Sequence, residues 1–235
     1  MPLGILYVFA KEPEPGRVKT RLCPPLTSQQ AADLAEAFLV DMLAALAAGS
    51  EGLFESRLAV SPGRGGPRLS ALAATFGLAR IEQGEGDLGR RMCRVMEAGL
   101  DEAPMVALVG ADVPDLPVAH VRAAFEALAA GRGAAAPQVV LGPSSDGGYY
   151  LVAARRRVPR LFRIHARWGG SGVLAATTAA LDDERIAYAL LPQWSDVDDA
   201  ASLASLWQRI GSDPSTRCVR SADALARLRR QGWRP

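Results

Sequence analysis

The sequence predicts an α/β protein with a mostly parallel central sheet. Apolar strand-like segments alternate with amphipathic helical segments along the 235 residues, and this alternation requires right-handed crossovers between parallel strands. Two apolar runs, residues 5–10 and 105–109, lack the polar alternation of a half-exposed strand, so they are expected to be buried on both faces. No internal repeat or low-complexity linker divides the chain, which favours one main domain.

The elements follow from local patterns in chain order. A capping box at Thr27 and Gln30 begins a helix whose apolar residues recur at helical spacing as far as Gly49. Asp87 is placed to cap a later helix. The other expected strands cover residues 54–60, 78–82, 134–141, 149–153 and 187–191, and the other helices 68–76, 87–100, 118–131, a segment from near 171, a segment around 203–210 and a short one at 222–230.

The composition excludes several classes of function. The net charge of +2 is small and dispersed, which argues against nucleic acid as a partner. Cys23, Cys93 and Cys218 show neither metal nor disulfide spacing, as expected in a reducing cytoplasm. The apolar run near the N-terminus is too short for a membrane span and no signal-peptide pattern precedes it, so we expect a cytoplasmic protein without a membrane partner.

A basic loop follows the first strand. It carries Lys11, Arg17, Lys19 and Arg21, and Gly16 allows close backbone approach. The loop fits neither the P-loop pattern nor the dinucleotide pattern G-x-G-x-x-G. In an open α/β sheet, ligands bind outside the carboxyl ends of the strands. The loop therefore predicts a cradle for phosphate groups, the alternative being a solvated loop with surface charges.

Two carboxylates follow the second buried run. Asp112 comes directly after the strand, where its side chain would reach the ligand-binding edge and suit Mg²⁺, which prefers oxygen ligands. Asp115 precedes Leu116 and Pro117 and is expected to cap the next helix. After the last strand, Asp198 is expected to be an N-cap, although Asp196 or Asp198 could supply a second metal carboxylate.

A glycine-rich segment, residues 142–150, has two interpretations that remain open. Asp146 and Gly147 between apolar runs are typical of a hairpin turn. The hydroxyls of Ser144 and Ser145 and the bare backbone at Gly148 equally suit an acceptor site. His120 and His165 lie in unpatterned contexts and are expected to be structural, and no catalytic Ser-His-Asp or Cys-His arrangement is found.

Taken in order, these motifs resemble a known family. The chain is similar to the bacterial glycosyltransferase-like, radical-SAM/selenodomain-associated transferases. The motifs that carry the resemblance are Lys11-x-Pro-x-Pro-Gly16-x-x-Lys19-Thr20-Arg21-Leu22, Gln83-Gly-x-Gly-Asp87-Leu88-Gly89-x-Arg91-Met92, Gly110-x-Asp112-x-Pro114-x-Leu116, Asp146-Gly-Gly-Tyr-Tyr-Leu151 and Asp196-Val-Asp198. The chain is more distantly similar to phospholactate guanylyltransferases and molybdenum-cofactor nucleotidyltransferases. The resemblance covers roughly residues 3–210.

The resemblance implies a GT-A-type fold, a three-layer α/β sandwich with a mostly parallel, mixed sheet, over residues 1–211, followed by a C-terminal extension with a short helix, 212–235. It implies Mg²⁺ or Mn²⁺ as cofactor, held by Asp112 and Asp198. The implied catalytic residues are Lys19, Arg21 and Asp112. The implied nucleotide-binding residues are Ala10, Lys11, Gly16, Arg17, Lys19, Arg21, Gln83, Gly89 and Arg91, and the acceptor-binding residues Ser144, Asp146, Gly147, Gly148, Trp168 and Ser171.

One departure affects the acceptor side. Where the family pattern has Trp-Ser-Thr, this chain has Trp168-Gly-Gly-Ser171-Gly172. We expect this glycine-rich segment to lie near Asp146 and to move when no acceptor is bound, and Ser171 to cap the next helix.

The sequence therefore predicts a metal-dependent transferase. It would use a nucleoside triphosphate or nucleotide-sugar and transfer a nucleotidyl or glycosyl group to a small acceptor. A homodimer is a possible assembly. The alternative is a catalytically silent nucleotide-binding or regulatory module, which would need the basic loop but not Asp112.

Overall fold

The computed structural model describes residues 2–62, 66–131, 133, 136–164, 168–212 and 218–234. His165 and the first two residues of the strand expected at 134–141 lie outside these ranges. No helix in the described part of the chain is long and apolar enough to cross a lipid bilayer.

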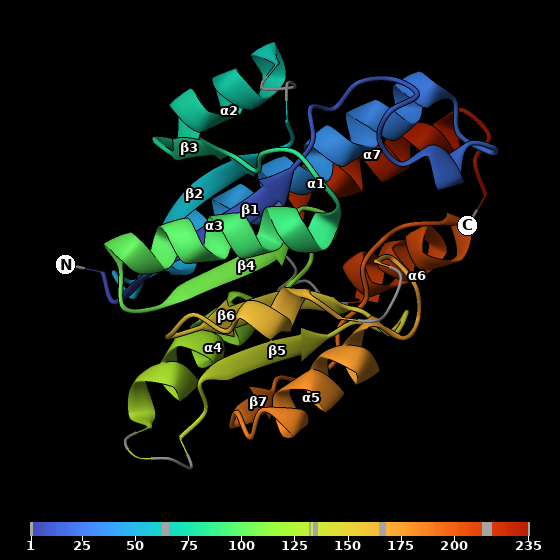
Figure 1. Ribbon diagram of the computed structural model, residues 1–235. Helices are drawn as coiled ribbons and strands as arrows, with labels where there is room; N and C mark the ends of the chain where they lie inside the picture. The colour runs from blue at the N-terminus through green and yellow to red at the C-terminus, as the bar shows by residue number, and fades with distance from the viewer. Residues whose placement is uncertain are drawn as a thin grey trace.

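A seven-stranded mixed sheet forms the centre of the molecule (Figure 1). Its order is β3-β2-β1-β4-β6-β5-β7. Strand β6 runs antiparallel to both of its neighbours, whereas the other neighbouring pairs are parallel. The strands are β1 (Gly4–Ala10), β2 (Phe54–Val60), β3 (Ala79–Glu82), β4 (Val106–Gly110), β5 (Val139–Pro143), β6 (Tyr149–Ala154) and β7 (Tyr188–Leu190). The mostly parallel, mixed sheet expected from the sequence is confirmed.

Helices cover both faces of the sheet and complete three layers. The core on one face includes side chains of α1 (Ser28–Gly49), α2 (Pro67–Phe76) and α4 (Val118–Ala130). The core on the other face includes α3 (Leu88–Glu102), the 3-10 turn η2 (Pro159–Phe162) and α5 (Val173–Asp183). In Figure 1, α3 crosses in front of the sheet while α4 lies behind it.

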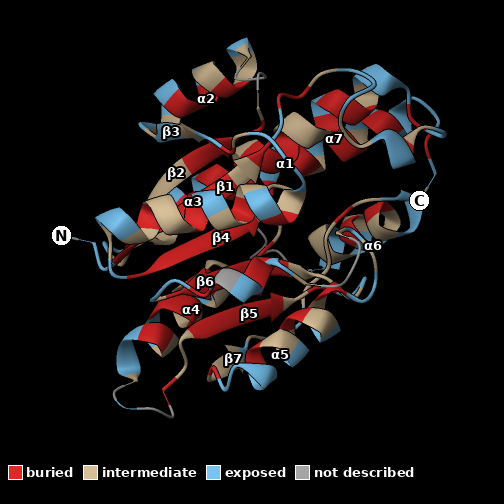
Figure 2. Cartoon of the chain, viewed as in Figure 1, coloured by how far each residue is buried: buried red, intermediate tan, exposed pale blue. Residues whose placement is uncertain are grey.

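Strand β1 shows why the sheet is buried on both sides. Leu6, Val8 and Ala10 pack into the core with α1, whereas Ile5 and Tyr7 pack into the core with α3. Successive side chains of a strand point to opposite faces, so an unbroken apolar run satisfies both layers. Figure 2 shows the central strands as mainly buried and the outer surfaces of the helices as exposed.

A third apolar cluster lies apart from the sheet. It joins α1 to α6 (Ala200–Ser212) and α7 (Val219–Arg230), together with Leu22 and Leu26 from the segment that enters α1. Asp41 of α1, only 4% exposed, accepts hydrogen bonds from the amides of Arg220 and Ser221 and from the Ser221 hydroxyl. This carboxylate from another helix caps α7, and the helix begins at Val219 rather than at 222 as expected.

Local caps and turns agree with the sequence in part. The Thr27–Gln30 capping box and the Asp87 cap of α3 are confirmed, and the segment around Gly147 connects β5 to β6 as a hairpin. The expected cap by Asp115 is wrong, because Pro117 precedes α4 and no side chain caps it. The expected cap by Ser171 is also wrong, since Gly172 is the N-cap of α5 and no side-chain bond is made.

The chain order places a switch point between β1 and β4. From β1 the chain proceeds to β2 and β3 on one side, and then returns to place β4 on the other side of β1. Connections that leave in opposite directions open a crevice at the carboxyl ends of two adjacent parallel strands, where ligands bind in such sheets. The basic loop follows β1 there, and Asp112 follows β4.

Candidate active site

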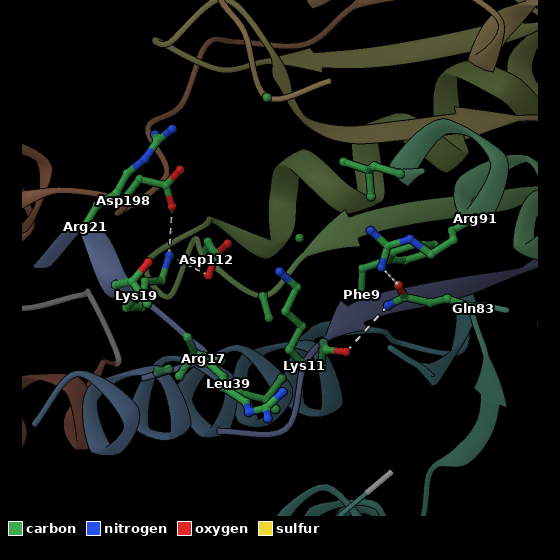
Figure 3. Close-up of a pocket in the computed structure, with 18 residues that line it drawn as sticks. Phe9, Lys11, Arg17, Lys19, Arg21, Leu39, Gln83, Arg91, Asp112 and Asp198 are labelled. Atoms are coloured by element: carbon green, nitrogen blue, oxygen red, sulfur yellow. Dashed lines mark hydrogen bonds and ion pairs between the residues drawn. The ribbon is translucent and has the colours of Figure 1, made fainter. Parts of the chain in front are cut away.

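A cavity of about 490 Å³ opens at this switch point (Figure 3). Its wall comes from the ends of β1 and β4, the basic loop, the middle of α1 and the start of α3. Figure 3 shows Lys19 beside Asp112 and Asp198 in one part of the cavity and Arg91 with Gln83 in another. The lining residues are Phe9, Ala10, Lys11, Arg17, Val18, Lys19, Thr20, Arg21, Ala35, Leu39, Gln83, Leu88, Arg91, Gly110, Ala111, Asp112, Gly169 and Asp198.

Lys19 lies at the centre of the charged part of the cavity. Its Nζ is 2.6 Å from Oδ1 of Asp112 and 3.0 Å from Oδ1 of Asp198, and it donates to the carbonyl oxygen of Val197 at 2.5 Å. The Val197 amide in turn donates to the carbonyl of Asp112 at 2.9 Å. These contacts bring three segments together: the loop after β1, the end of β4 and the approach to α6.

The electrostatics keep Lys19 charged. Its side chain is only 5% exposed, and burial disfavours an ammonium ion. The attraction of Asp112 and Asp198 and their hydrogen bonds outweigh burial, so the pKa of Lys19 is raised above its usual value. The Lys19 backbone adopts the left-handed conformation with φ 49°, directly before the 3-10 turn η1 (Thr20–Leu22). This unusual conformation is part of how the loop brings Lys19 to the carboxylates.

The remaining cations line the cavity in a more open setting. Lys11 and Arg21 are exposed, and within the described residues neither makes an ion pair. Arg17 is also exposed and pairs with Glu14 at 3.3 Å. Exposed guanidinium groups keep the freedom to contact phosphate oxygens in pairs.

Arg91 is held by Gln83. Gln83 is 3% exposed, and its amide nitrogen donates to the Ala59 carbonyl at 2.8 Å. Its amide oxygen accepts from Nη1 of Arg91 at 2.9 Å. Gln83 therefore fixes the arginine in the cavity wall, and its own polar atoms are directed at the protein.

A buried carboxylate anchors the start of the basic loop. Glu12 is 4% exposed and accepts from the amides of Arg68 and Leu69, in the first turn of α2, at 2.9 and 3.1 Å. Gly66, the N-cap of α2, has no side chain to satisfy these donors. Glu12 thus caps α2 from another part of the chain and ties the basic loop to it.

The two segments expected to bind the acceptor lie together. The Leu174 amide donates to the Gly147 carbonyl at 2.9 Å, and a Cβ at Gly147 would lie 2.0 Å from the Ser171 carbonyl oxygen. Trp168 contacts the ring of Tyr149 edge-on. Gly169 also lines the cavity, so this segment connects the predicted acceptor region to the cationic pocket.

Acidic groups surround the hairpin. Ser144 is buried and donates to Oδ1 of Asp196 at 2.8 Å, while Asp146 accepts from the Gly148 amide. Burial raises the pKa of Asp196, and the nearby charges of Asp198 and Asp146 add to this rise. The hydroxyl of Ser144 is thus already engaged within the protein.

The structure places the predicted residues unevenly. Most of the predicted nucleotide-binding residues line one cavity together with Asp112 and Asp198, but Gly16 and Gly89 are not among its lining residues. Gly89 has a packing reason instead, because a Cβ there would lie 2.4 Å from the Trp168 indole nitrogen. Of the 168–171 segment it is Gly169 that reaches the cavity wall.

Two expected carboxylate roles change. Asp199, not Asp198, accepts from the Ser202 amide in the first turn of α6, so the expectation that Asp198 caps this helix is wrong. Asp115 accepts from Nε of Arg209 at 2.6 Å and from the indole of Trp194 at 3.3 Å. Asp198 is thereby left for Lys19, whereas Asp115 is engaged away from the cavity.

Sequence reasoning missed several wall residues. Ala35 and Leu39 on α1 line the cavity, and their helical periodicity could have placed them on the face toward β1. The Val197 carbonyl, which accepts from Lys19, has no sequence signal because any residue supplies one.

The oxygen atoms around the Lys19 ammonium partly suit a divalent cation. The described residues contain no group of three or more His, Cys, Asp or Glu side chains that could hold a metal ion. Two carboxylate oxygens and one carbonyl oxygen nevertheless converge on a single cation, the Lys19 ammonium. Mg²⁺ is usually held by one or two carboxylates plus substrate phosphates and water, so Asp112 and Asp198 fit such an ion.

Comparison with known proteins gives the family. A family model described as an uncharacterized protein conserved in bacteria (DUF2064) matches residues 42–170, more than half of the chain. The chain belongs to the DUF2064 family. A crystal structure from Desulfovibrio desulfuricans G20, described as a candidate nucleotide-diphospho-sugar transferase, is 31% identical and has a TM-score of 0.82. The match covers 97% of this chain and 98% of that one.

More distant structures share the fold of this DUF2064 protein. A cytidylyltransferase from Leptospira borgpetersenii serovar Hardjo-bovis (strain JB197) has 12% identity and a TM-score of 0.62, over 98% of this chain and 95% of that one. A CMP:2-keto-3-deoxy-manno-octonic acid synthetase complexed with CTP has 13% identity and a TM-score of 0.53, over 88% and 98%. No curated protein matches the chain. The predicted GT-A-like fold is confirmed by these structures. The prediction of a transferase is confirmed by the relative of 31% identity.

Proposed function

We propose that this transferase is metal-dependent and uses a nucleoside triphosphate or a nucleotide-sugar. It would transfer the nucleotidyl or glycosyl group to a small acceptor. The observation that carries the proposal is the cavity at the β1–β4 switch point, where five cationic side chains and two carboxylates meet. Ligands of open α/β sheets bind at such a point.

The cations would bind the phosphate groups of the donor. Lys11, Arg17 and Arg21 are exposed at the cavity mouth, and Arg91 is fixed in its wall by Gln83. Positioned cations stabilise the negative charge that develops on a leaving diphosphate. Chemistry of this kind depends mainly on orientation and charge, which a pre-formed cationic cavity supplies.

The carboxylates would hold Mg²⁺ or Mn²⁺. Asp112 and Asp198 share one cation in this structure and have half-exposed side chains, open to an ion arriving from solvent. When bound, the metal would neutralise donor phosphate oxygens. A silent binding module would have no need of this paired arrangement, which favours the enzymatic reading.

The acceptor would bind beside the hairpin. Residues 144–148 and 168–171 lie against each other, and Gly169 connects them to the cavity. The neighbours named as a cytidylyltransferase and as a CMP-sugar synthetase support nucleotidyl transfer, whereas the 31% identical relative carries a sugar-transferase description. Both kinds of transfer would use the same donor cavity.

Calorimetric titration with the four nucleoside triphosphates and common nucleotide-sugars, with and without Mg²⁺, tests this function. At least one ligand should bind, and more tightly with Mg²⁺. At a concentration of a hundred times its Kd, it should stabilise the fold by about 2.7 kcal/mol.

The matched pair of variants is Arg21→Ala and Arg122→Ala. Arg122 lies on α4 and pairs with Glu51, outside the cavity. Arg21→Ala should weaken binding by roughly tenfold to a hundredfold, because a charge-assisted hydrogen bond contributes about 1.5–3 kcal/mol. Arg122→Ala should leave affinity unchanged. If no nucleotide binds, or both variants behave alike, the proposed function fails.

A further inference from the structure

The Lys19 ammonium occupies a position shaped for a cation. Three oxygens approach it within 3.0 Å: Asp112 Oδ1, Asp198 Oδ1 and the Val197 carbonyl. The lysine side chain is 5% exposed, whereas those of Asp112 and Asp198 are 52% and 42% exposed. The ammonium therefore lies on the inner side of a carboxylate pair whose outer side faces solvent.

A divalent ion and this ammonium compete for the same oxygens. Both Oδ1 atoms contact one Nζ, so the two oxygens lie no farther apart than the two N–O distances taken together. A divalent ion held by both oxygens would lie close to the buried ammonium, and the two positive charges would repel each other. A metal bridging the two carboxylates would therefore force Lys19 out of its place.

Lys19 has another anion available nearby. It lines the same cavity as Lys11, Arg17 and Arg21, where the phosphates of a donor would bind. A lysine carries its charge on a flexible four-carbon stem and can reach different partners from one backbone position. The Lys19 ammonium could then pair with a donor phosphate while Asp112 and Asp198 bind the metal.

We propose that Lys19 is an internal competitor for the metal site. Without donor it holds Asp112 and Asp198 and keeps the divalent ion from binding between them; with donor it moves to the phosphates and leaves the carboxylates to the metal. The inference rests on the proposed function and adds that metal and donor bind cooperatively. The coupling is reciprocal, since each ligand favours the state in which Lys19 has left the carboxylates.

The test is a titration of the donor-free protein with Mn²⁺, in which electron paramagnetic resonance measures the concentration of unbound Mn²⁺. Lys19→Met keeps the length of the side chain and removes its charge, so the variant should bind Mn²⁺ at least about tenfold more tightly than the native protein. Adding Asp198→Asn to Lys19→Met should remove the gain. Melting temperatures verify that each variant is folded.

Lys11→Met is the matched control. It removes the same charge from the same cavity, but within the described residues Lys11 makes no ion pair with a carboxylate. It should change Mn²⁺ affinity less than about threefold, because its effect would be only a screened long-range one.

Two results would overturn the inference: no gain of Mn²⁺ affinity in folded Lys19→Met, or an equal gain in Lys11→Met. The experiment contains no nucleotide, so it is independent of the nucleotide titrations. A negative result here with positive titrations rejects Lys19 as competitor and leaves the transferase function intact. Negative titrations reject the function whatever Mn²⁺ does.

Discussion

Asp112→Asn separates a metal ligand from a purely structural ion-pair partner. The substitution keeps the size of the side chain and an oxygen that can accept from Lys19, but it removes the negative charge. Lys19 would keep Asp198 at 3.0 Å and the Val197 carbonyl at 2.5 Å. The backbone bond between Val197 and the Asp112 carbonyl does not involve the side chain.

The effect on folding should therefore be small. The Asp112 side chain is 52% exposed, so solvent screens its attraction for Lys19. We expect a loss of about 0.5–1 kcal/mol in the free energy of unfolding. For a chain of this length such a loss lowers Tm by roughly 1–4 °C.

Asp112→Asn should abolish the increase in nucleotide affinity that Mg²⁺ causes. If Asp112 is one of only two carboxylates for the metal, the ratio of nucleotide affinities with and without Mg²⁺ should fall to about one, since Mg²⁺ depends on charged oxygen ligands. Binding without metal should persist because the cations remain. Calorimetry with and without Mg²⁺ gives the ratio, and scanning calorimetry gives Tm.

Asp199→Asn is the control for this substitution. Asp199 lies beside Asp198 but accepts from the Ser202 amide as a helix cap, a role that asparagine fills equally well. The control should retain both stability and the Mg²⁺ effect. An Asp112→Asn protein that folds normally and still binds nucleotide more tightly with Mg²⁺ would refute the assignment of Asp112 as a metal ligand.

Three further predictions concern the surroundings of the site. Asp41→Ala removes a buried acceptor of three hydrogen bonds and should lower the free energy of unfolding by about 3 kcal/mol in urea titrations; a loss below about 1 kcal/mol would contradict its capping role. Burial, with the charges of Asp41 and Asp115, raises the pKa of Cys218 to about 12, so at pH 8 iodoacetamide should label it only after denaturation; fast labelling in the native protein would disprove this. Gly147→Ala meets the Ser171 carbonyl and a φ of 89°, so it should lower Tm and alter Trp168 fluorescence, and an unchanged spectrum would contradict this packing.

Patterns confined to neighbouring residues predicted the structure well. The composition of the apolar runs that form β1 and β4 was enough to predict that both faces of these strands are buried. The Thr27 capping box and the hairpin at Gly147 also depend on residues a few positions apart. Such elements are determined locally, and tertiary packing then had no reason to override them.

Pairings across the chain could not be predicted in the same way. Asp115 sits where a helix cap is expected, yet Arg209, distant in sequence, takes its carboxylate. The same holds for Lys19: the sequence placed it in a phosphate cradle and gave Asp198 as a helix cap or a second metal carboxylate, but no local pattern indicated that the two would meet. In both cases the carboxylate pairs with a cation that the fold brings close, instead of accepting a hydrogen bond from the local backbone amide.

The meeting of Lys19 and Asp198 depends on the third apolar cluster. Leu22 follows Lys19 within one turn of chain, and Val197 directly precedes Asp198; both are fully buried in the cluster that α7 completes with Leu225. A residue held at positive φ, as Lys19 is, keeps that conformation only where its surroundings impose it. The family model ends at residue 170, so α6 and α7 lie beyond it. These C-terminal helices nevertheless pack against the two segments that bring Lys19 to Asp198, and they therefore help to position the residues of the candidate active site.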